Sequence, residues 1–181
     1  MSRAACLAAA LAAVIATVAP AVMEMPPLLL WNASASTPIG LYAIREIGAP
    51  TAGVLTVIEP PEAVARFTAE RGYLPLGVPM LKHVEGLPGE EVCRVGRVIT
   101  VNGLAVGAAL ERDRIGRALP DWQGCRIIAA DEIFVMNPKV QDSLDGRYFG
   151  PFPASSIVGR ALPLWTDEGG DGHYAWLAPV N

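Results

Sequence analysis

The sequence predicts a single, mainly β domain that follows an apolar N-terminal helix. Glycine and proline are abundant, at 18 and 16 of the 181 residues, and this composition favours a turn-rich β protein over a helical bundle. Asn102 and Gly103 lie between two short apolar runs, which is typical of a β-hairpin with a two-residue turn. An uninterrupted apolar run near the start of the chain predicts the helix.

The apolar run covers residues 4–23, and none of these positions carries a charged side chain. As a helix that rises about 1.5 Å per residue, the run is long enough for a hydrocarbon core roughly 30 Å thick. Arg3 before the run and Glu24 after it favour an N-terminus on the inner side. We therefore expect residues 1–25 to be a membrane anchor and residues 26–181 to be an exported domain. A cleaved secretory signal would export the same domain, and a helix of a soluble core is the third interpretation.

Short apolar or alternating runs between Gly and Pro residues predict the strands of the exported domain. The expected strands are Leu41–Arg45, Val54–Glu59, Met80–Val84, Glu91–Arg94, Val98–Val101, Leu104–Val106, Arg126–Ala130, Glu132–Met136 and Ile157–Leu164. A helix is expected over Pro61–Arg71, because Pro stands at its start, an acidic residue in its first turn and Gly after its end.

Three further segments have no regular pattern of this kind. Residues 26–31 predict either a segment in the membrane interface or a first buried strand. Residues 107–124 carry many charges and predict an irregular excursion between strands. Residues 167–172 are rich in Asp and Gly and predict the flexible start of a C-terminal tail.

Charge and cysteine usage exclude several classes of function. The net charge of −4 and the isoelectric point near 5.2 argue against nucleic acid as a partner. His83 and His173 lie far apart and no Cys-x-x-Cys spacing occurs, so neither a metal site nor another cofactor is expected. Cys93 and Cys125 form an even pair, for which a disulfide is expected in an oxidising compartment. Two buried free thiols are the alternative.

Two serines in the segment NASASTPIGLY, residues 32–42, are the first candidates for chemistry. Ser34 and Ser36 are two positions apart, so in an extended chain their side chains share one face. One hydroxyl can then act as a nucleophile while the other donates a hydrogen bond to the same carbonyl. A Ser/Thr/Pro-rich connecting loop is the alternative interpretation.

Lysine is scarce, because Lys82 and Lys139 are the only two in the chain. Lys82 lies between Leu81 and His83 in an apolar stretch, where a strand directs alternate side chains into the core. Burial disfavours the charged form of a lysine and lowers its pKa, so the amine can act as the general base for a serine hydroxyl. A solvent-exposed lysine on an edge strand is the alternative interpretation.

A third polar segment, residues 137–151, contains Ser143, Asp145 and Arg147. In an extended chain Ser143 and Asp145 share a face, and Asp145 can form a charge-assisted pair with Arg147. A surface loop with a solvated ion pair is the alternative interpretation.

In this order, the three segments resemble the membrane-anchored signal peptidases that use a Ser/Lys dyad. The likeness is greatest to the TraF branch, the conjugative-transfer peptidases that mature pilin subunits. NASASTPIGLY is similar to the nucleophile segment of that branch, LKHVEGLPGE to its lysine strand and turn, and SLDGRYFGP to its S-x-D-S-R-Y-x-G box. Gly146 stands where the family usually has Ser, and Glu90 replaces the commoner Asp. We expect neither departure to affect catalysis.

The resemblance implies a coiled, mostly antiparallel β-sheet domain with one or two short helices behind an N-terminal transmembrane helix. It also implies a location in the bacterial inner membrane with the catalytic domain in the periplasm, or a periplasmic protein if the N-terminal segment is cleaved. Ser36 matches the nucleophile and Lys82 the general base. Ser34 matches the residue whose hydroxyl joins the Ser36 N–H in the oxyanion hole.

Three more positions are carried over in the same way. Ser143 matches the residue that orients the lysine amine, and Asp145 and Arg147 match the pair that braces this region. The implied function is cleavage, with or without cyclisation, of a prepilin substrate for conjugative transfer. A general signal peptidase that acts on exported preproteins and a non-catalytic membrane-tethered component of a transfer apparatus are the alternatives. A Ser/His/Asp triad through His83 is a further alternative, although His83 and Lys82 are neighbours and so point to opposite sides of a strand.

Overall fold

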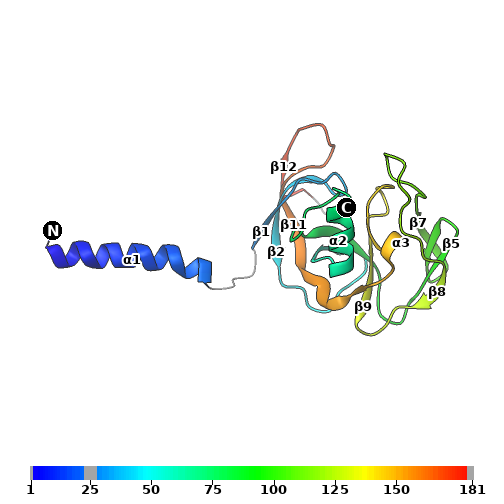
Figure 1. Cartoon of the computed structure of the whole chain (residues 1–181), viewed down its shortest axis with the longest axis horizontal. Helices are drawn as coiled ribbons and strands as arrows, with labels where there is room; N and C mark the ends of the chain where they lie inside the picture. Colours follow the sequence, from blue (N-terminus) through cyan, green and yellow to red (C-terminus); the bar gives the residue numbers. More distant parts are fainter. Residues whose placement is uncertain (1, 23–27, 179–181) are drawn as a thin grey trace.

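The computed structural model describes residues 2–22 and 28–178. Within these ranges, helix α1 spans Arg3–Val22, and residues 28–178 form a mainly β domain (Figure 1). The predicted fold class is confirmed, because every strand pair in the described ranges is antiparallel and the helices of the domain are short. Among the described residues, no helix combines the length and the hydropathy needed to cross a membrane, so the predicted transmembrane anchor is not confirmed.

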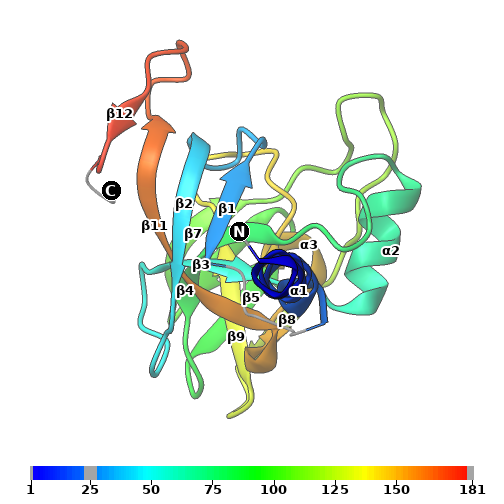
Figure 2. The ribbon, with the colours of Figure 1, turned by 90° about the vertical axis from the view of Figure 1, so that its left-hand side faces the viewer.

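The larger of two sheets has eight strands in the order β1-β2-β11-β3-β4-β9-β10, with β12 paired to β11. Figure 2 shows β1, β2 and β11 side by side. The strands are β1 (Leu29–Asn32), β2 (Ile39–Arg45), β3 (Leu55–Ile58), β4 (Met80–Gly86), β9 (Glu132–Met136), β10 (Phe152–Pro153), β11 (Ile157–Asp167) and β12 (Ala175–Trp176).

The smaller sheet has four strands in the order β7-β6-β5-β8. They are β5 (Glu91–Val95), β6 (Val98–Val101), β7 (Leu104–Ala108) and β8 (Gly124–Ile127). Asn102 and Gly103 join β6 to β7 with φ angles of 50° and 77°, and positive φ at both central residues is what a type I′ hairpin turn requires. A disulfide between Cys93 and Cys125 links β5 to β8 at a directly opposed pair of residues.

Three short helical segments complete the domain: α2 (Glu62–Glu70), α3 (Gly146–Phe149) and the 3₁₀ segment η1 (Ala154–Ser156). The predicted helix is confirmed as α2, which begins directly after Pro61. Proline is favoured at this end of a helix because its fixed φ suits the first turn and its missing N–H has no intrahelical partner to lose. Val64 and Thr68 are one turn apart and form the buried face of α2.

Alternation along β4 divides the apolar core between the two faces of the larger sheet. Met80 and Val84 belong to a cluster on one face, and Leu81 belongs to a cluster on the other. The first cluster also contains Ile58, Val64, Ile133, Val135 and Phe152, and the second contains Tyr42, Ile44, Leu55, Val57 and Ala161. Lys82 has the same parity as Met80 and Val84, so its side chain enters the domain on the side of the first cluster.

Strand β9 connects the two sheets. Ile133 and Val135 pack in the first cluster, whereas Phe134 and Met136 pack against the smaller sheet. The residues of the smaller sheet in this third cluster are Val92, Ile99 and Val101. Because β9 is covered on both faces, the chain that leaves it at Asn137 starts from a fixed position in the middle of the domain.

Gly40 allows a close approach between β2 and β11. Its φ is 149°, and a Cβ atom at this position would lie 2.2 Å from the carbonyl oxygen of Trp165. Neither the angle nor the space is open to another residue. The segment that carries the two candidate serines therefore ends on a strand seated directly against β11.

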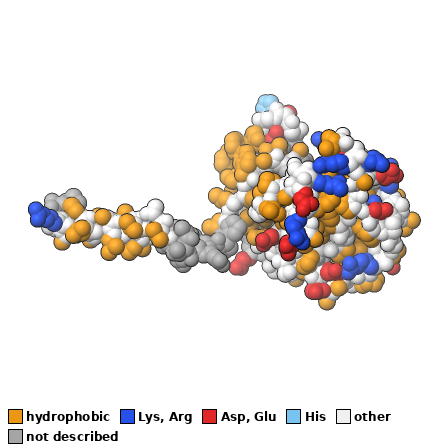
Figure 3. All heavy atoms as spheres, viewed as in Figure 1, with side chains coloured by type: hydrophobic (Ala, Val, Ile, Leu, Met, Phe, Trp, Pro, Cys, Tyr) orange, Lys and Arg blue, Asp and Glu red, His pale blue; other side chains and the backbone are white. Residues whose placement is uncertain are grey.

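Hydrophobic side chains gather on the surface near β1 and β12 (Figure 3). Leu29 and Trp31 of β1 are more than half exposed, although β1 pairs with β2. Trp31 stacks on Tyr174, which in turn lies against Trp165 of β11. Residues 29–31 thus form part of a strand, as one of the two interpretations predicted, but the strand is mostly exposed rather than buried. Pro26 and Pro27 lie outside the described residues.

The end of the domain differs from the expectation of a flexible tail. The carboxylate of Asp167 accepts hydrogen bonds from the backbone N–H groups of Asp171 and Gly172, and the chain then returns to β11 as β12. Aspartate favours such turns because its short side chain can satisfy nearby N–H groups. The Asp- and Gly-rich composition predicted a flexible segment and gave no sign of the hydrogen-bonded turn or of the short strand after it.

Gly103→Ala should destabilise the domain by about 1–2 kcal/mol, since the left-handed backbone conformation is costly for a residue with a Cβ atom. Urea unfolding of the purified protein measures the change. Gly48→Ala is the matched control, because Gly48 has no positive φ and open space around its Cβ position. Equal unfolding midpoints for the two variants would contradict the turn assignment.

Candidate active site

The loop between β1 and β2 carries Ser34 and Ser36 and is organised by Asn32. The Asn32 Nδ2 donates to the carbonyl oxygens of Ser34 at 2.8 Å, Thr37 at 3.1 Å and Pro38 at 3.0 Å. The Asn32 Oδ1 accepts from the backbone N–H of Ser34 at 3.1 Å. One buried amide thus satisfies the backbone of the loop, which folds as a turn rather than as the extended segment that we predicted.

The turn brings the two serine hydroxyls together, as expected, although for a different reason. Ser34 Oγ and Ser36 Oγ lie 2.9 Å apart, and the Ser36 N–H donates to Ser34 Oγ at 3.3 Å. Because the Ser34 oxygen accepts the Ser36 N–H, the Ser34 hydroxyl proton is free to be donated to Ser36 Oγ. Both predicted oxyanion donors therefore lie beside the predicted nucleophile.

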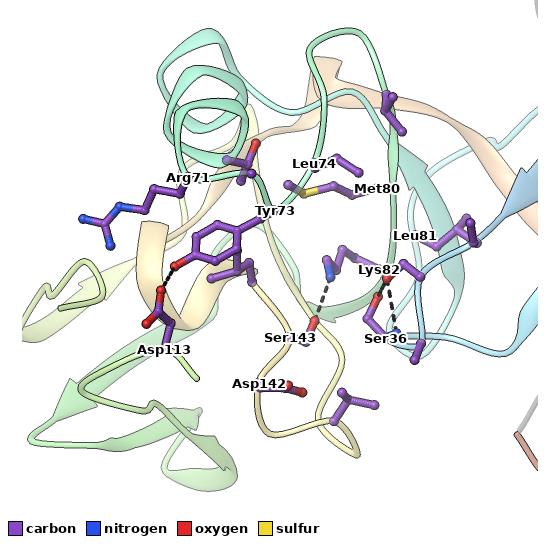
Figure 4. A pocket seen from close by; sticks show the side chains of 18 of the residues that line it. Ser36, Arg71, Tyr73, Leu74, Met80, Leu81, Lys82, Asp113, Asp142 and Ser143 are labelled. Carbon is purple, nitrogen blue, oxygen red and sulfur yellow. Dashed lines mark hydrogen bonds between the residues drawn. The ribbon is translucent and has the colours of Figure 1, made fainter. Parts of the chain in front are cut away.

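Lys82 is buried, with 3% of its surface exposed, and it enters the site from the middle of β4. Its Nζ donates a hydrogen bond of 2.7 Å to Ser143 Oγ, as predicted for the residue that orients the amine (Figure 4). Burial lowers the pKa of Lys82 from 10.5 to about 8; Asp145 acts in the opposite direction and Arg147 in the same direction. A sizeable fraction of Lys82 is therefore neutral at pH 7–8.

Asp145 and Arg147 form the predicted pair, and it is buried rather than solvated. The Arg147 Nε lies 2.8 Å from Asp145 Oδ1, and Arg147 Nη2 lies 3.0 Å from Asp145 Oδ2, which makes the pair bidentate. The two side chains are 1% and 0% exposed. Asp145 also caps α3 by accepting the backbone N–H of Arg147.

The remaining donors of Arg147 fix the loop that follows β9. They reach the carbonyl oxygens of Asn137 at 2.8 Å, Val140 at 3.0 Å and Gln141 at 2.9 Å. Ser143 comes two residues after the last of these carbonyls. The ion pair therefore holds Ser143 at the distance from β4 that its contact with Lys82 requires.

Ser36 and Lys82 both line a cavity of about 850 Å³, together with Ser34 and Ser143 (Figure 4). Within the described residues, the hydrogen bond of Lys82 Nζ goes to Ser143, and that of Ser36 Oγ goes to Ser34. The direct Ser36–Lys82 hydrogen bond of a dyad is thus not formed. A serine side chain rotates about a single torsion, and catalytic hydrogen bonds often tighten only when substrate is bound.

The far wall of this cavity is made by the predicted excursion and the chain after α2. The Arg117 Nε lies 2.6 Å from Asp113 Oδ2, and the same carboxylate accepts the hydroxyl of Tyr73. Arg71 donates to the carbonyl of Ala118 at 2.6 Å. These contacts join two loops into one wall, while Leu30 and Leu81 supply apolar lining near the serines.

His83 does not line the cavity that Ser36 shares with Lys82. It lines a second cavity of about 620 Å³, which Ser36 also lines and Lys82 does not, and its Nδ1 is 3.1 Å from Asn137 Oδ1. The rival triad through His83 finds no support in this contact. In the described ranges, Glu91, Cys93 and Cys125 place their ligand atoms within 4.8 Å of one another, but the two sulfurs are bonded together and cannot act as thiolate ligands.

Sequence reasoning missed the two asparagines of the site, Asn32 and Asn137. Each is buried, and each amide bonds to several backbone groups. A local signal existed for Asn32, because Asn before a Ser-rich turn commonly bonds to the backbone two residues on. The contacts of Asn137 connect residues far apart in the chain, and no local pattern shows them.

The geometry agrees with the comparison of this chain with protein families. The family described as "Signal peptidase, peptidase S26" matches residues 2–165. The chain therefore belongs to the S26 signal peptidase family, and it shares the mainly β fold class predicted for such a peptidase.

Individual relatives carry the name of the branch that the motifs indicated. "Probable conjugal transfer protein TraF" of Sinorhizobium fredii is 37% identical over 145 residues, which cover 75% of this chain and 76% of that protein. "Conjugal transfer protein TraF" of Agrobacterium fabrum is 32% identical over 145 residues, or 75% of this chain and 81% of that protein. A "Signal peptidase I" of Leptolyngbya laminosa is 32% identical over 114 residues, 62% of this chain and 51% of that protein. The predicted resemblance is confirmed.

Arg147→Ala should destabilise the domain by about 3–5 kcal/mol, because it leaves the Asp145 carboxylate buried without its partner. Denaturant unfolding followed by circular dichroism measures the loss. Arg66→Ala is the control, since Arg66 forms an exposed pair with Glu62 at 3.6 Å and should change the midpoint very little. Similar losses in both variants would refute the central role of the buried pair.

Proposed function

We propose that this chain is a serine endopeptidase that works through a Ser36/Lys82 dyad. The observation that carries the proposal is a buried lysine, with its pKa lowered to about 8, in the same cavity as a serine hydroxyl. Lysine so placed can take the proton of a serine without any histidine. Membership of the S26 peptidase family supports the same reaction.

Acylation begins when the Ser36 side chain turns from Ser34 towards Lys82. The neutral Lys82 amine accepts the Ser36 proton, and Ser36 Oγ bonds to the carbonyl carbon of the substrate. The Ser36 N–H exchanges its bond to Ser34 Oγ for one to the oxyanion, and the Ser34 hydroxyl, free once Ser36 has turned, donates the second. One such donor is worth about 3 kcal/mol of the barrier. The Lys82 ammonium then gives its proton to the leaving nitrogen, the C–N bond breaks, and an acyl ester on Ser36 remains.

Deacylation decides the product. Water that gives its proton to Lys82 releases a trimmed carboxylate, whereas a substrate amine in the same place joins two chain ends. Ser143 holds the Lys82 amine in both half-reactions through the 2.7 Å hydrogen bond. Apolar side chains such as Leu30 and Leu81 next to the serines suit small, uncharged residues before the cut.

We propose a prepilin of a conjugative-transfer system as the substrate. The names of the TraF relatives support this choice, as does the order of the three motifs. The Cys93–Cys125 disulfide supports a location of the domain in an oxidising compartment outside the cytoplasm, such as the periplasm. General processing of exported preproteins is the same chemistry with a broader choice of substrate.

The value of kcat/KM should rise with pH through about 8 and level off above it. Only the neutral amine of Lys82 accepts the serine proton, and its fraction grows as the pH passes the pKa. Initial rates on a quenched fluorescent peptide, measured between pH 6 and 10, test this. An activity that falls over this range would contradict Lys82 as the base.

Co-expression with a candidate prepilin should convert it to a shorter product whose intact mass identifies the chemistry. Hydrolysis gives the trimmed mass, and cyclisation gives the trimmed mass less one water. Ser36→Ala and Lys82→Met should abolish the conversion, because one removes the nucleophile and the other replaces the base with an apolar side chain of similar length.

Lys139→Met is the matched control for this experiment. Lys139 is the other lysine of the chain, is exposed, and does not line the cavity that holds Ser36 and Lys82. It should process the prepilin as the unmodified protein does. Processing that survives Lys82→Met would overturn the dyad, and processing of many unrelated preproteins at equal rates would favour the general signal peptidase.

A further inference from the structure

Asn137 is the first residue after β9, and its side chain lies between the nucleophile loop and the lysine strand. It is 2% exposed. Its Nδ2 donates to the carbonyl oxygen of Ser36 at 2.9 Å and to that of Leu81 at 3.0 Å. Its Oδ1 accepts from the backbone N–H of His83 at 3.3 Å and lies 3.1 Å from His83 Nδ1.

These partners leave the amide a single orientation. Carbonyl oxygens only accept hydrogen bonds, so the NH₂ group must face Ser36 and Leu81. A backbone N–H only donates, so the amide oxygen must face His83. His83 Nδ1 then carries a proton and donates to the same oxygen. The side chain has both of its donors and its acceptor engaged, and a rotated amide would lose all of these bonds.

The backbone of Asn137 is equally constrained. Its N–H donates to Asp145 Oδ2 at 3.0 Å, and its carbonyl accepts from Arg147 Nη2 at 2.8 Å. One residue therefore contacts the nucleophile loop, the lysine strand and the buried ion pair. The loop that ends at Ser143 starts from this same point.

We propose that Asn137 is the positioning residue that sets Ser36 relative to Lys82. It does not line the cavity in which the two meet and contacts it only through the Ser36 and Leu81 carbonyls. Its bond to Ser36 fixes the peptide from which the attacking hydroxyl projects, and its bond to Leu81 fixes the peptide just before Lys82. A misplacement of about 1 Å between reacting groups can cost about 10²-fold in rate.

This inference rests on the proposed dyad, and the test separates the two. A p-nitrophenyl ester of an N-capped alanyl-alanine releases p-nitrophenol in a burst as Ser36 is acylated. The burst amplitude counts the competent molecules, and the burst rate constant reports the acylation of each one. Ser36→Ala must lose the burst; if the burst persists, the proposed function fails rather than the role of Asn137.

For Asn137→Ala, the burst amplitude per mole of protein should stay near that of the unmodified enzyme, and the rate constant should fall about 10²-fold. The concentration of ester that gives half the maximal rate should stay within about twofold, since the cavity wall is unchanged. A residue with only a structural role would instead lower the amplitude and leave the rate constant of the folded molecules unchanged. That result would overturn the proposal.

Tyr148→Phe is the matched control for a lost buried hydrogen bond. The Tyr148 side chain is buried and its hydroxyl accepts the N–H of Leu110 at 3.0 Å. Leu110 belongs to the cavity wall, but the Tyr148 hydroxyl bonds neither to Ser36 nor to Lys82. This variant should have a lower melting temperature and an unchanged burst rate constant. If Asn137→Ala does not fold, Asn137→Asp has nearly the same shape and lacks the NH₂ group. Its burst rate constant should also fall, and a value equal to that of the unmodified enzyme would refute the assignment.

Discussion

The buried ion pair of Asp145 and Arg147 is the interaction on which the site depends. Neither charge could stay in the interior alone, and the bidentate geometry with further hydrogen bonds compensates for the lost hydration. Arg147 gathers backbone carbonyls from residues 137–141, and Asp145 holds the N–H of Asn137 and the start of α3. The backbone of the loop between β9 and α3 is thus bonded to one guanidinium, and these bonds also fix the position of Ser143, which lies in the same loop.

The same pair leaves the charge state of Lys82 to be decided by burial. Asp145 alone would favour the ammonium form and raise the pKa of Lys82, whereas Arg147 and desolvation both lower that pKa. Arg147 therefore offsets part of the effect of Asp145, and burial, which is the largest effect, keeps the pKa of Lys82 low. Lys82 can therefore become a neutral amine although its surroundings contain an ion pair and many hydrogen bonds.

Much of this arrangement could be predicted from local sequence patterns. Alternation around Lys82 indicated a buried amine, and the Asn-Gly pair indicated the hairpin, because both depend on neighbours along the chain. The contact between Ser34 and Ser36 was expected for an extended segment, whereas a turn produces it. The bonds of Asn137 join it to Ser36 and Leu81 across 101 and 56 positions, so only the assembled fold reveals them.

Gly40 limits which sequences can present this nucleophile loop at all. A side chain there would meet the Trp165 carbonyl at 2.2 Å, so a scan of all substitutions should find the position intolerant, although it carries no reacting atom. Ala33 and Ala35, by contrast, are exposed within the same loop. The close approach of the β2 and β11 backbones at Gly40 thus restricts substitution at one end of the loop. Ala33 and Ala35, which alternate with the two serines, are the positions that can vary.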